Sequence, residues 1–440
     1  MARGVYIETF GCQMNEVDSA RMIALLGAEE YRPVSSLSDA DLVLLNTCSI
    51  REKADQKFYS ALGLLRRWKR GRRGRLVAVG GCLAQQEGTA LKRRAPHVDI
   101  VFGTHSIARL PELVRLAQRD GAPVSTELSG DTSHWDVLPY VAGGSASAMV
   151  TIMQGCDNYC AYCIVPFVRG AEISRPSADI MAEIRELARR GVCEVVLLGQ
   201  NVNSYGKKEG EIAFPALLRG ISRVPGIRRI RFLTSHPRDL TGETIRLFSE
   251  IESLCPGIHL PLQSGSERIL SAMGRGYTRG EYLDRVRDLR RARPGIAFSS
   301  DFIVGFPGET ESDFRETLAV MDDVRYDSAF SFRFSPRPGT RAAEMAASVP
   351  PDEASERLYR LQELQDRHTR ERLDACVGKE MEVLAEGPSA RDPGRLCGRT
   401  PCCKTVNFSP AADSRGVMHR VRIRSAGRHS LSDEEGGPHG

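Results

Sequence analysis

The strongest constraint on this chain is a trio of cysteines, Cys156, Cys160 and Cys163, spaced C-x3-C-x2-C after the apolar run 148–153. An iron–sulfur cube held only by cysteine takes four thiolates, and a structural zinc site normally takes four nitrogen or sulfur ligands. A cube held by three thiolates leaves one iron open, so a cofactor can bind the metal directly and accept an electron from it. The spacing alone leaves a zinc knuckle, or chance clustering among the chain's twelve cysteines, as the alternative.

The segments around these cysteines carry a family resemblance. GCDN at 155–158 and CIVPFVRG at 163–170 are similar to the tRNA methylthiotransferase branch of the radical S-adenosylmethionine (SAM) enzymes. The resemblance implies that Cys156, Cys160 and Cys163 are catalytic and hold a [4Fe–4S] cluster. Its open iron binds SAM, and electron transfer cleaves SAM to a 5′-deoxyadenosyl radical. The protein contributes placement and electrostatics to such chemistry.

Length and composition set the outer limits. A chain of 440 residues predicts about three domains. No run of eighteen apolar residues is present, and the first residues read as the start of a strand rather than a signal peptide. We therefore expect a soluble, cytoplasmic protein without membrane contact, in which cysteines are ligands or buried thiols rather than disulfides. The net charge of +5 is mild, so affinity for nucleic acid has to come from local patches.

The N-terminal region repeats one unit, an apolar strand followed by a cysteine and an amphipathic helix. The cysteines are Cys12, Cys48 and Cys82, and 36 and 34 residues separate them. That is the length of a strand-helix-strand crossover, so residues 3–119 are predicted to form an open parallel sheet with the three cysteines at one edge. Ligands gather at this edge, where the following helices point their positive N-termini. The strands are expected at 5–10, 41–45 and 76–79.

A single buried cysteine at a strand end is common, but three at the same phase of one repeat indicate a shared ligand. FGCQMN at 10–15, NTCSIREKA at 46–54 and GGCLAQ at 80–85 resemble the three ligand segments of the methylthiotransferase N-terminal domain. The resemblance implies that Cys12, Cys48 and Cys82 hold an auxiliary [4Fe–4S] cluster that is implicated in supplying sulfur. SIREK at 49–53 is similar to the branch acting on isopentenylated adenosine, rather than to the threonylcarbamoyladenosine or ribosomal-protein branches.

A basic run and three histidines in this region can each be interpreted in two ways. Residues 66–75 hold seven cations and no acid, which is typical of a solvated helix end but also fits a salt-sensitive phosphate contact. His97, His105 and His134 show no metal-ligand spacing, so we interpret them as surface or core residues.

The central region alternates strands and helices a second time. After a small and polar stretch at 121–146, which we interpret as a linker, residues 142–374 hold six apolar strands separated by amphipathic helices. This pattern predicts an incomplete parallel barrel, and the resemblance implies the same. The strands are expected at 148–153, 194–198, 228–233, 257–262, 296–304 and 328–334, and a closing helix at 352–373.

Chemistry in such barrels lies at the C-terminal rim, and the segments after these strands are rich in amides, hydroxyls and glycine. Such residues suit hydrogen bonding to a polar cofactor, although glycine alone is weak support because strand-to-helix turns also need it. The resemblance implies that one loop lies near the SAM adenine and that two glutamines contact SAM. These residues are Gly305, Phe306 and Pro307 in the loop, and Gln200 and Gln263.

The C-terminal region, residues 376–438, changes to short alternating strands, expected at 380–384, 404–408 and 417–424. Apolar and basic residues alternate at 421–424, which buries one face and offers the other to an anion. GRT at 398–400, VNF at 406–408 and VRI at 421–423 resemble the TRAM module, a small barrel that binds RNA. The tail after Leu431 is expected to be disordered.

The remaining cysteines are interpreted as structural. PCCK at 401–404 departs from the polar and basic residues that are common there in the family. Cys397, Cys402 and Cys403 have no fourth ligand at ordinary spacing, so we interpret them as incidental thiols rather than a zinc site. Cys193 and Cys255 lie at strand starts, on the rim away from the predicted chemistry.

The sequence thus predicts an α/β protein with three domains: an open parallel sheet, a partial (β/α)6 barrel and a small β-barrel. The resemblance implies an enzyme with two [4Fe–4S] clusters and SAM that adds a methylthio group to carbon 2 of N6-isopentenyladenosine at position 37 of tRNA. One SAM would methylate cluster-bound sulfide, and a second would generate the radical that abstracts hydrogen. That carbon–hydrogen bond has no acidic proton near neutral pH, which explains the need for a radical.

The expected partners are tRNA, a reductant such as flavodoxin or ferredoxin, and iron–sulfur assembly or carrier proteins, with the chain itself a monomer. Two alternatives stay open. The same chemistry could act on another modified adenosine or on a side chain of a ribosomal protein. A protein of a different class, a non-enzymatic RNA-binding module whose cysteines hold zinc, would contain zinc in place of iron and labile sulfide.

Overall fold

The computed structural model describes residues 3–49, 52–72, 74–119, 121–139, 145–208, 210–390, 392–409 and 416–434, with only the backbone of 52–54. The chain divides into two compact units. Unit 1 comprises residues 1–141, 153–157 and 163–175, and unit 2 comprises 142–152, 158–162 and 176–440. Both the barrel and the C-terminal sheet belong to unit 2, and the finer division into three domains stays a prediction.

Unit 1 is built on a six-stranded sheet in the order β2-β1-β3-β4-β5-β6, with every pair parallel. The open parallel sheet is therefore confirmed. The three strands that the sequence did not predict, β2, β5 and β6, have only two or three residues each, too few for a clear pattern. One of them, β6, lies in the stretch expected to be a linker. The strands are β1 (Arg3–Thr9), β2 (Tyr31–Pro33), β3 (Leu42–Thr47), β4 (Leu76–Gly81), β5 (Ile100–Phe102) and β6 (Val124–Ser125).

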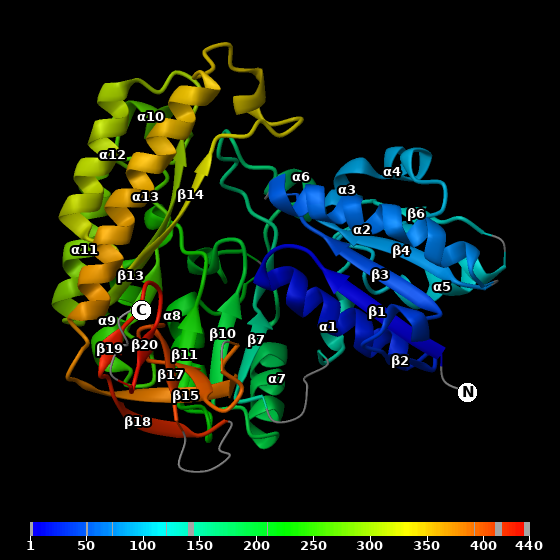
Figure 1. Ribbon diagram of the computed structural model, residues 1–440, viewed down its shortest axis with the longest axis horizontal. Coiled ribbons are helices and arrows are strands. Elements are labelled where there is room, and N and C mark those ends of the chain that lie inside the picture. The colour runs from blue at the N-terminus through cyan, green and yellow to red at the C-terminus, as the bar shows by residue number, and fades with distance from the viewer. Residues whose placement is uncertain are drawn as a thin grey trace. The chain divides into compact units, whose positions relative to one another are not determined.

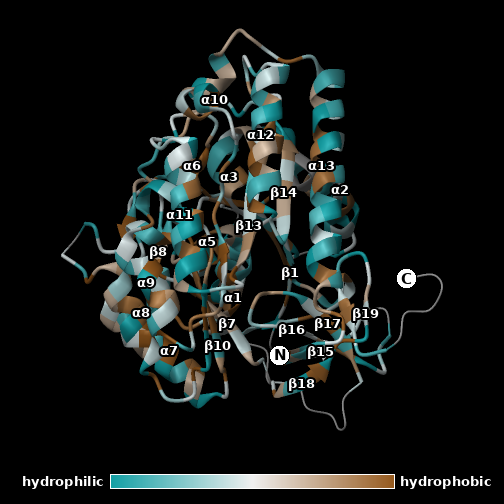
Figure 2. Ribbon diagram, turned by 90° about the vertical axis from the view of Figure 1, so that its left-hand side faces the viewer, coloured by the Kyte–Doolittle hydropathy of each residue, from teal (hydrophilic) through white to brown (hydrophobic). Residues whose placement is uncertain are grey.

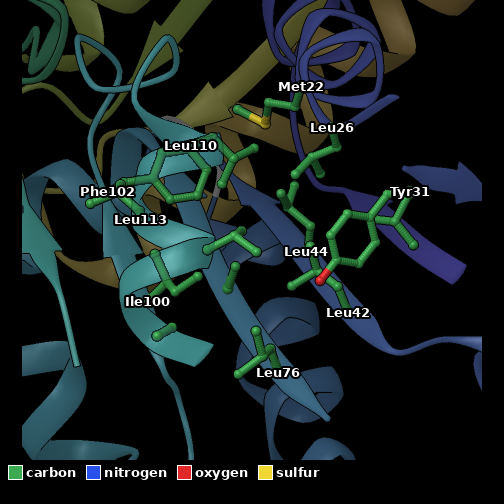
Figure 3. Packing of buried hydrophobic residues seen from close by; sticks show 14 of the residues in the cluster. Met22, Leu26, Tyr31, Leu42, Leu44, Leu76, Ile100, Phe102, Leu110 and Leu113 are labelled. Carbon is green, nitrogen blue, oxygen red and sulfur yellow. The ribbon is translucent and has the colours of Figure 1, made fainter. Parts of the chain in front are cut away.

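Helices cover both faces of this sheet (Figure 1). Along β3, Leu42 and Leu44 join one core cluster while Val43 and Leu45 join the other, because successive strand residues point to opposite faces. Figure 3 shows Leu42 and Leu44 in the first cluster, which also contains Met22 of α1. A sheet buried on both sides explains why its strands are apolar throughout. The helices are α1 (Gln13–Gly27), α2 (Glu52–Arg70), α3 (Cys82–Glu87), α4 (Thr89–Arg94) and α5 (Leu110–Gln118).

Unit 1 also contains two later segments of the chain. The short strands β8 (Met153–Gln154) and β9 (Ile173–Ser174) pair in antiparallel fashion, and α6 (Val165–Arg169) lies between them in sequence. Ile164 and Val168 pack against Cys82, at the start of α3. The segment 163–175 is thereby attached to the carboxyl end of the unit 1 sheet.

The barrel of unit 2 has two groups of three parallel strands, β11-β10-β7 and β12-β13-β14, with one parallel bridge between Ile230 and Leu254. The predicted incomplete parallel barrel is confirmed. Its strands are β7 (Ser147–Thr151), β10 (Glu194–Leu198), β11 (Arg229–Phe232), β12 (Gly257–His259), β13 (Ala297–Val304) and β14 (Ser328–Arg333). Its helices are α7 (Ser177–Arg189), α8 (Phe214–Ser222), α9 (Gly242–Glu250), α10 (Glu267–Ala272), α11 (Arg279–Ala292), α12 (Glu311–Val324) and α13 (Pro351–Asp374).

Local sequence explains the ends and faces of these helices. Thr278 and Thr310 each begin a helix with a reciprocal capping box, in which the side chain accepts from the third helical N–H. In α13, Leu361 and Leu364 are buried, and Figure 2 shows polar and apolar residues alternating along this helix, which is typical of one buried face. No helix in the described ranges is long and apolar enough to cross a lipid bilayer.

The C-terminal residues form a curled sheet of six strands in the order β18-β15-β16-β17-β20-β19. The alternation predicted at 421–424 is confirmed, since Val421 and Ile423 are buried while Arg422 and Arg424 are exposed. The expected disorder after Leu431 is wrong for Ser432, which pairs with Ser425, while residues 435–440 lie outside the described part. The strands are β15 (Glu380–Pro388), β16 (Leu396–Arg399), β17 (Thr405–Phe408), β18 (Met418–Arg422), β19 (Ser425–Ala426) and β20 (Leu431–Ser432).

A buried arginine, Arg231, joins this sheet to the barrel within unit 2. Glu194 of β10 accepts a hydrogen bond from Arg231 of β11 at 2.9 Å. Arg231 also donates to the carbonyl oxygens of Thr400 and Pro401, at 2.8 and 2.7 Å, and to the sulfur of Cys403 at 3.0 Å. The unusual PCCK segment is therefore part of a turn through which the C-terminal sheet contacts the barrel.

Candidate active site

Unit 1 brings Cys12, Cys48 and Cys82 together at the carboxyl ends of neighbouring strands. Cys12 immediately precedes α1, Cys48 follows β3, and Cys82 opens α3 directly after β4. Strands β1, β3 and β4 are adjacent in the sheet. Gly11 permits this approach, because a Cβ at that position would lie only 2.4 Å from the Cβ of Cys48.

The electrostatic surroundings of this N-terminal trio favour anionic sulfur at Cys12 and partly oppose the effect of burial at Cys82. A hydrogen bond with Cys48 lowers the pKa of Cys12 to about 6 against the effect of burial, and the positive charge of Arg169 lowers it further. Burial raises the pKa of Cys82, and Arg169 opposes that rise. The sulfur of Cys12 also donates to Asn15 Oδ1 at 3.5 Å. Thiolates are the form in which cysteine binds metal, so these surroundings suit a metal–sulfur group.

Arg169, at the end of α6, is the buried cation beside these thiols. One guanidinium nitrogen, Nη2, donates to Asp18 Oδ2 at 2.8 Å and to Asn15 Oδ1 at 3.3 Å. The other, Nη1, is buried without a hydrogen-bond partner in the described chain. Unpaired buried donors are rare in folded proteins, so this one is consistent with a ligand that accepts a hydrogen bond.

His134 adds a neutral group to the same polar region. Burial lowers its pKa to about 4, and neither ring nitrogen has a hydrogen-bond partner among the described residues. Asp18, Arg21, Arg169 and Asp131 are the charged groups that act on its ring. The sequence indicated a surface or core histidine, and the core alternative is confirmed.

The loop that carries the other cysteine trio, Cys156, Cys160 and Cys163, is divided between the two units. Cys156 and Cys163 belong to unit 1, whereas Cys160 belongs to unit 2. In unit 1 the N–H of Cys156 donates to the carbonyl of Gly170 at 3.2 Å. Gly155 has a φ of +80°, and a Cβ there would lie 2.0 Å from the Ala171 carbonyl oxygen, so only glycine fits.

The Cys160 part of the loop is held within unit 2. Ala161 donates its N–H to the Met273 carbonyl at 2.8 Å, and its own carbonyl accepts from Ala342 at 2.9 Å. The guanidinium of Arg275 donates to the sulfur of Cys160 at 3.4 Å. Cys160 is 8% exposed, so this contact is shielded from water.

Several buried polar atoms at the rim of the barrel have no hydrogen-bond partner within the described chain. They lie on the segments that follow β10 and β11. An unpaired buried polar atom costs about 1–3 kcal/mol, so a cluster of them indicates a site for a polar ligand. The atoms are Gln200 Oε1, Asn201 Oδ1, both amide atoms of Asn203, Ser235 Oγ and His236 Nε2.

His236 is a neutral member of this rim. Burial and the positive charge of Arg275 lower its pKa to about 2. Its Nδ1 accepts a hydrogen bond from the N–H of Arg238 at 3.3 Å, so Nε2 carries the proton. Nearby, Asp239 accepts from Asn201 Nδ2 at 2.7 Å and pairs with Lys207. The rim therefore presents both donors and acceptors to a ligand.

The other predicted SAM contacts occupy the same end of the barrel strands. Gln263 adopts a φ of +76° and forms a backbone bridge with Phe302. Gly305 donates its N–H to Glu309 Oε2 at 2.6 Å, and Pro307 is buried. Phe306 is fully buried in a cluster with Ala161, Ile269, Met273 and Ala342, so its ring supports the cysteine loop. Contacts of these residues with SAM stay predictions.

Sequence reasoning included Asn203 and His236 among the residues of the rim segments without giving them a role, and it did not include Arg275. Only Arg275 carries a recognisable signal, because it lies between Gly274 and Gly276, which both have a positive φ. An arginine fixed between two turn glycines is an unusual place for a long charged side chain. The amides and the histidine are ordinary loop residues until the fold buries them.

A single metal ion and a four-iron cube need different arrangements of their protein ligands. Within the described residues, no three or more Cys, His, Asp or Glu side chains are arranged to hold a single metal ion. In a four-iron cube each thiolate binds a different iron, so the sulfur atoms do not have to meet at one point. The buried thiols beside Arg169 and Arg275 fit such an anionic group.

Comparison with known proteins identifies the family. Residues 4–103 match the uncharacterized protein family UPF0004, and residues 150–321 match the radical SAM superfamily. A tRNA-2-methylthio-N(6)-dimethylallyladenosine synthase of Pelobacter propionicus is 50% identical over 98% of both chains. That of Geobacter sulfurreducens is also 50% identical, over 98% of this chain and 97% of the relative. The chain belongs to the family of tRNA-2-methylthio-N(6)-dimethylallyladenosine synthases.

Two solved structures have a fold similar to that of this chain. The radical SAM methyltransferase TsrM from Kitasatospora setae aligns with a TM-score of 0.60 at 17% identity, covering 78% of this chain and 75% of that one. The cobalamin-dependent radical enzyme OxsB aligns with a TM-score of 0.55 at 12% identity, covering 83% and 56%. Membership of the radical SAM superfamily implies SAM and one [4Fe–4S] cluster.

The buried pair of Arg169 and Asp18 gives a prediction about stability. Arg169→Met should destabilise unit 1 by about 3–5 kcal/mol, because it leaves the Asp18 carboxylate buried without a cation. The double variant Asp18→Asn with Arg169→Met removes both charges and should recover much of this loss. Urea denaturation followed by tryptophan fluorescence measures the effect, since Trp68 and Trp135 both belong to unit 1. Equal losses in the two variants would contradict the prediction.

Proposed function

We propose that the chain adds a methylthio group to carbon 2 of N6-isopentenyladenosine at position 37 of tRNA. The relatives that match nearly the whole chain support this activity and do not favour the alternatives. The observation that carries the proposal is the convergence of Cys12, Cys48 and Cys82 beside Arg169 at one edge of the unit 1 sheet. An ordinary radical SAM reaction needs only one cysteine trio.

The two trios have different tasks in this proposal. Cys156, Cys160 and Cys163 would hold the cluster of the radical SAM superfamily, and Cys12, Cys48 and Cys82 would hold an auxiliary [4Fe–4S] cluster. When bound, the first supplies the electron that cleaves SAM, and the second supplies the site of the sulfur. The protein provides buried cations beside both sets of thiolates, which stabilises anionic sulfur away from water.

SAM would bind at the barrel rim. Its amino, carboxylate and ribose groups are hydrogen-bonding groups of the kind that the unpaired atoms of Gln200, Asn203 and Ser235 require. Neutral His236 can donate from Nε2 without adding a charge beside the sulfonium. We assign the positioning of SAM to these residues together with Gln263 and the loop of Gly305, Phe306 and Pro307.

The tRNA backbone would contact the basic run at the end of α2. Arg66, Arg67 and Arg70 are exposed, and none makes an ion pair in the part of the chain that the structure describes. By contrast, Lys69 and Arg72 pair with Asp99 and Asp41. The three unpaired arginines are therefore the members of the run that remain available to phosphates.

The remaining assignments follow from this function. A reductant such as flavodoxin or ferredoxin would deliver the electron, and iron–sulfur carrier proteins would load the clusters. We propose that the protein acts as a monomer in the cytoplasm, where tRNA is modified. The C-terminal sheet, similar in sequence to the TRAM module, would add a second RNA contact through the exposed Arg422 and Arg424.

Single-cysteine variants test the division of labour. Cys156→Ala should abolish SAM cleavage, because the radical SAM cluster loses a ligand. Cys48→Ala should keep part of the SAM cleavage and lose methylthiolation. Both are measured by chromatography of 5′-deoxyadenosine and of nucleosides from isopentenylated anticodon-loop RNA. Cys193→Ala, which changes a cysteine outside both trios, is the control and should retain both activities. Full product formation by Cys48→Ala would refute the sulfur assignment.

A salt titration tests the phosphate contact. Replacing Arg66, Arg67 and Arg70 by alanine should weaken tRNA binding most at low salt and reduce the slope of log affinity against log salt by about 1 per lost contact. The control variant replaces Arg287, Arg291 and Arg315, exposed arginines on α11 and α12, and removes the same charge. If both variants show the same slope, the basic run is only a solvated helix end.

A further inference from the structure

Arg275 is a buried cation that donates a hydrogen bond to Cys160, one of the proposed cluster ligands. It is 4% exposed and lies in the connection between α10 and α11. Nη1 donates to the sulfur of Cys160 at 3.4 Å and to the hydroxyl of Tyr162 at 3.3 Å. The guanidinium therefore points at the loop that carries Cys160.

The orientation of this guanidinium is fixed from the opposite side. Nη2 donates to the carbonyl of Pro261 at 2.8 Å, and Nε donates to the hydroxyl of Tyr277 at 3.0 Å. Tyr277 in turn donates to the carbonyl of Leu262 at 2.8 Å. Pro261 and Leu262 follow β12, so the end of a barrel strand holds the arginine in place, directly and through Tyr277, with its planar group directed at Cys160.

Arg275 lacks the counter-charge that three other buried arginines have. Arg169 pairs with Asp18, Arg231 with Glu194, and Arg357 with Glu309. No carboxylate forms an ion pair with Arg275 in the described ranges, where its partners are a thiol, two phenols and a carbonyl. A buried cation without an anion is costly, so the site calls for negative charge at the sulfur.

We propose that Arg275 is the counter-charge of the Cys160 thiolate and a positioning residue that makes the radical SAM cluster easier to reduce. This inference rests on the proposed assignment of Cys160 as a cluster ligand. Hydrogen bonds to ligand sulfur and nearby charge are among the factors that set the reduction potential of iron–sulfur clusters. A positive charge beside the sulfur favours the reduced, more negative form, and reduction is the step that precedes SAM cleavage.

A redox titration of the isolated cluster tests the proposal. The full chain with Cys12→Ala, Cys48→Ala and Cys82→Ala keeps only the second trio, so its electron paramagnetic resonance signal reports one cluster. In this background Arg275→Gln should lower the equilibrium constant for reduction at least tenfold, equivalent to about 59 mV for one electron. Arg275→Lys keeps the charge but not the planar fork, so it should lie between the parent and the glutamine variant.

Arg229→Gln is the matched control, because it removes the same charge as Arg275→Gln. Arg229 is also a buried arginine of unit 2, but it donates to Glu382 and to the carbonyl of Arg399 rather than to a cysteine. Its replacement should perturb packing without changing the potential. A purely structural role of Arg275 predicts lower thermal stability with the parent's potential, and that result would overturn the proposal.

A measurement on the unsubstituted arginine covers the case in which the variants do not fold. The same triple-cysteine background, labelled with 15N-arginine and reduced without SAM, should show a 15N coupling in pulsed resonance spectra, because Nη1 lies beside the Cys160 sulfur. Absence of this coupling would contradict the proposal. If no cluster forms in this background, the ligand assignment itself fails. A normal cluster that is insensitive to Arg275 refutes only the present inference.

Discussion

The contact between buried guanidinium groups and cysteine sulfur is the interaction on which the proposed chemistry depends. Thiolates and reduced clusters are anionic, and a low-dielectric interior disfavours them unless a cation is close. Arg169 acts on Cys12 and Cys82 in unit 1, and Arg275 donates to Cys160 in unit 2. Each trio thus has its own source of positive charge, which is consistent with two separate sites for anionic sulfur.

The two arginines are fixed by different means, and this difference suits different tasks. Arg169 is neutralised by Asp18, and its Nη1 has no hydrogen-bond partner among the described residues, so it can bind an additional hydrogen-bonding ligand with little change in net charge. In the part of the chain that the structure describes, Arg275 has only neutral partners besides Cys160, so its charge acts on the sulfur without competition from a carboxylate. The first arrangement suits a site that receives an extra sulfur species, and the second suits a site that receives an electron.

Much of the fold could be predicted from sequence because its strands are apolar and regularly spaced. Cysteines 36 and 34 residues apart, each after such a strand, predict from the sequence alone that one trio lies at a single sheet edge. Short strands such as β5 and β6 have too few residues to show a period, and the buried state of Asn203 and Ser235 arises only when distant segments meet at the rim. Arg275 illustrates the same limit, since 115 residues separate it from Cys160.

The central claim is that six cysteines form two independent cluster sites. Iron and acid-labile sulfide content after anaerobic reconstitution tests it most directly, in the parent chain and in two triple variants, one for each trio replaced by alanine. The account predicts about eight irons in the parent and about four in each variant, since each cube contains four. Zinc in place of iron, or a variant that keeps the iron content of the parent, would contradict it.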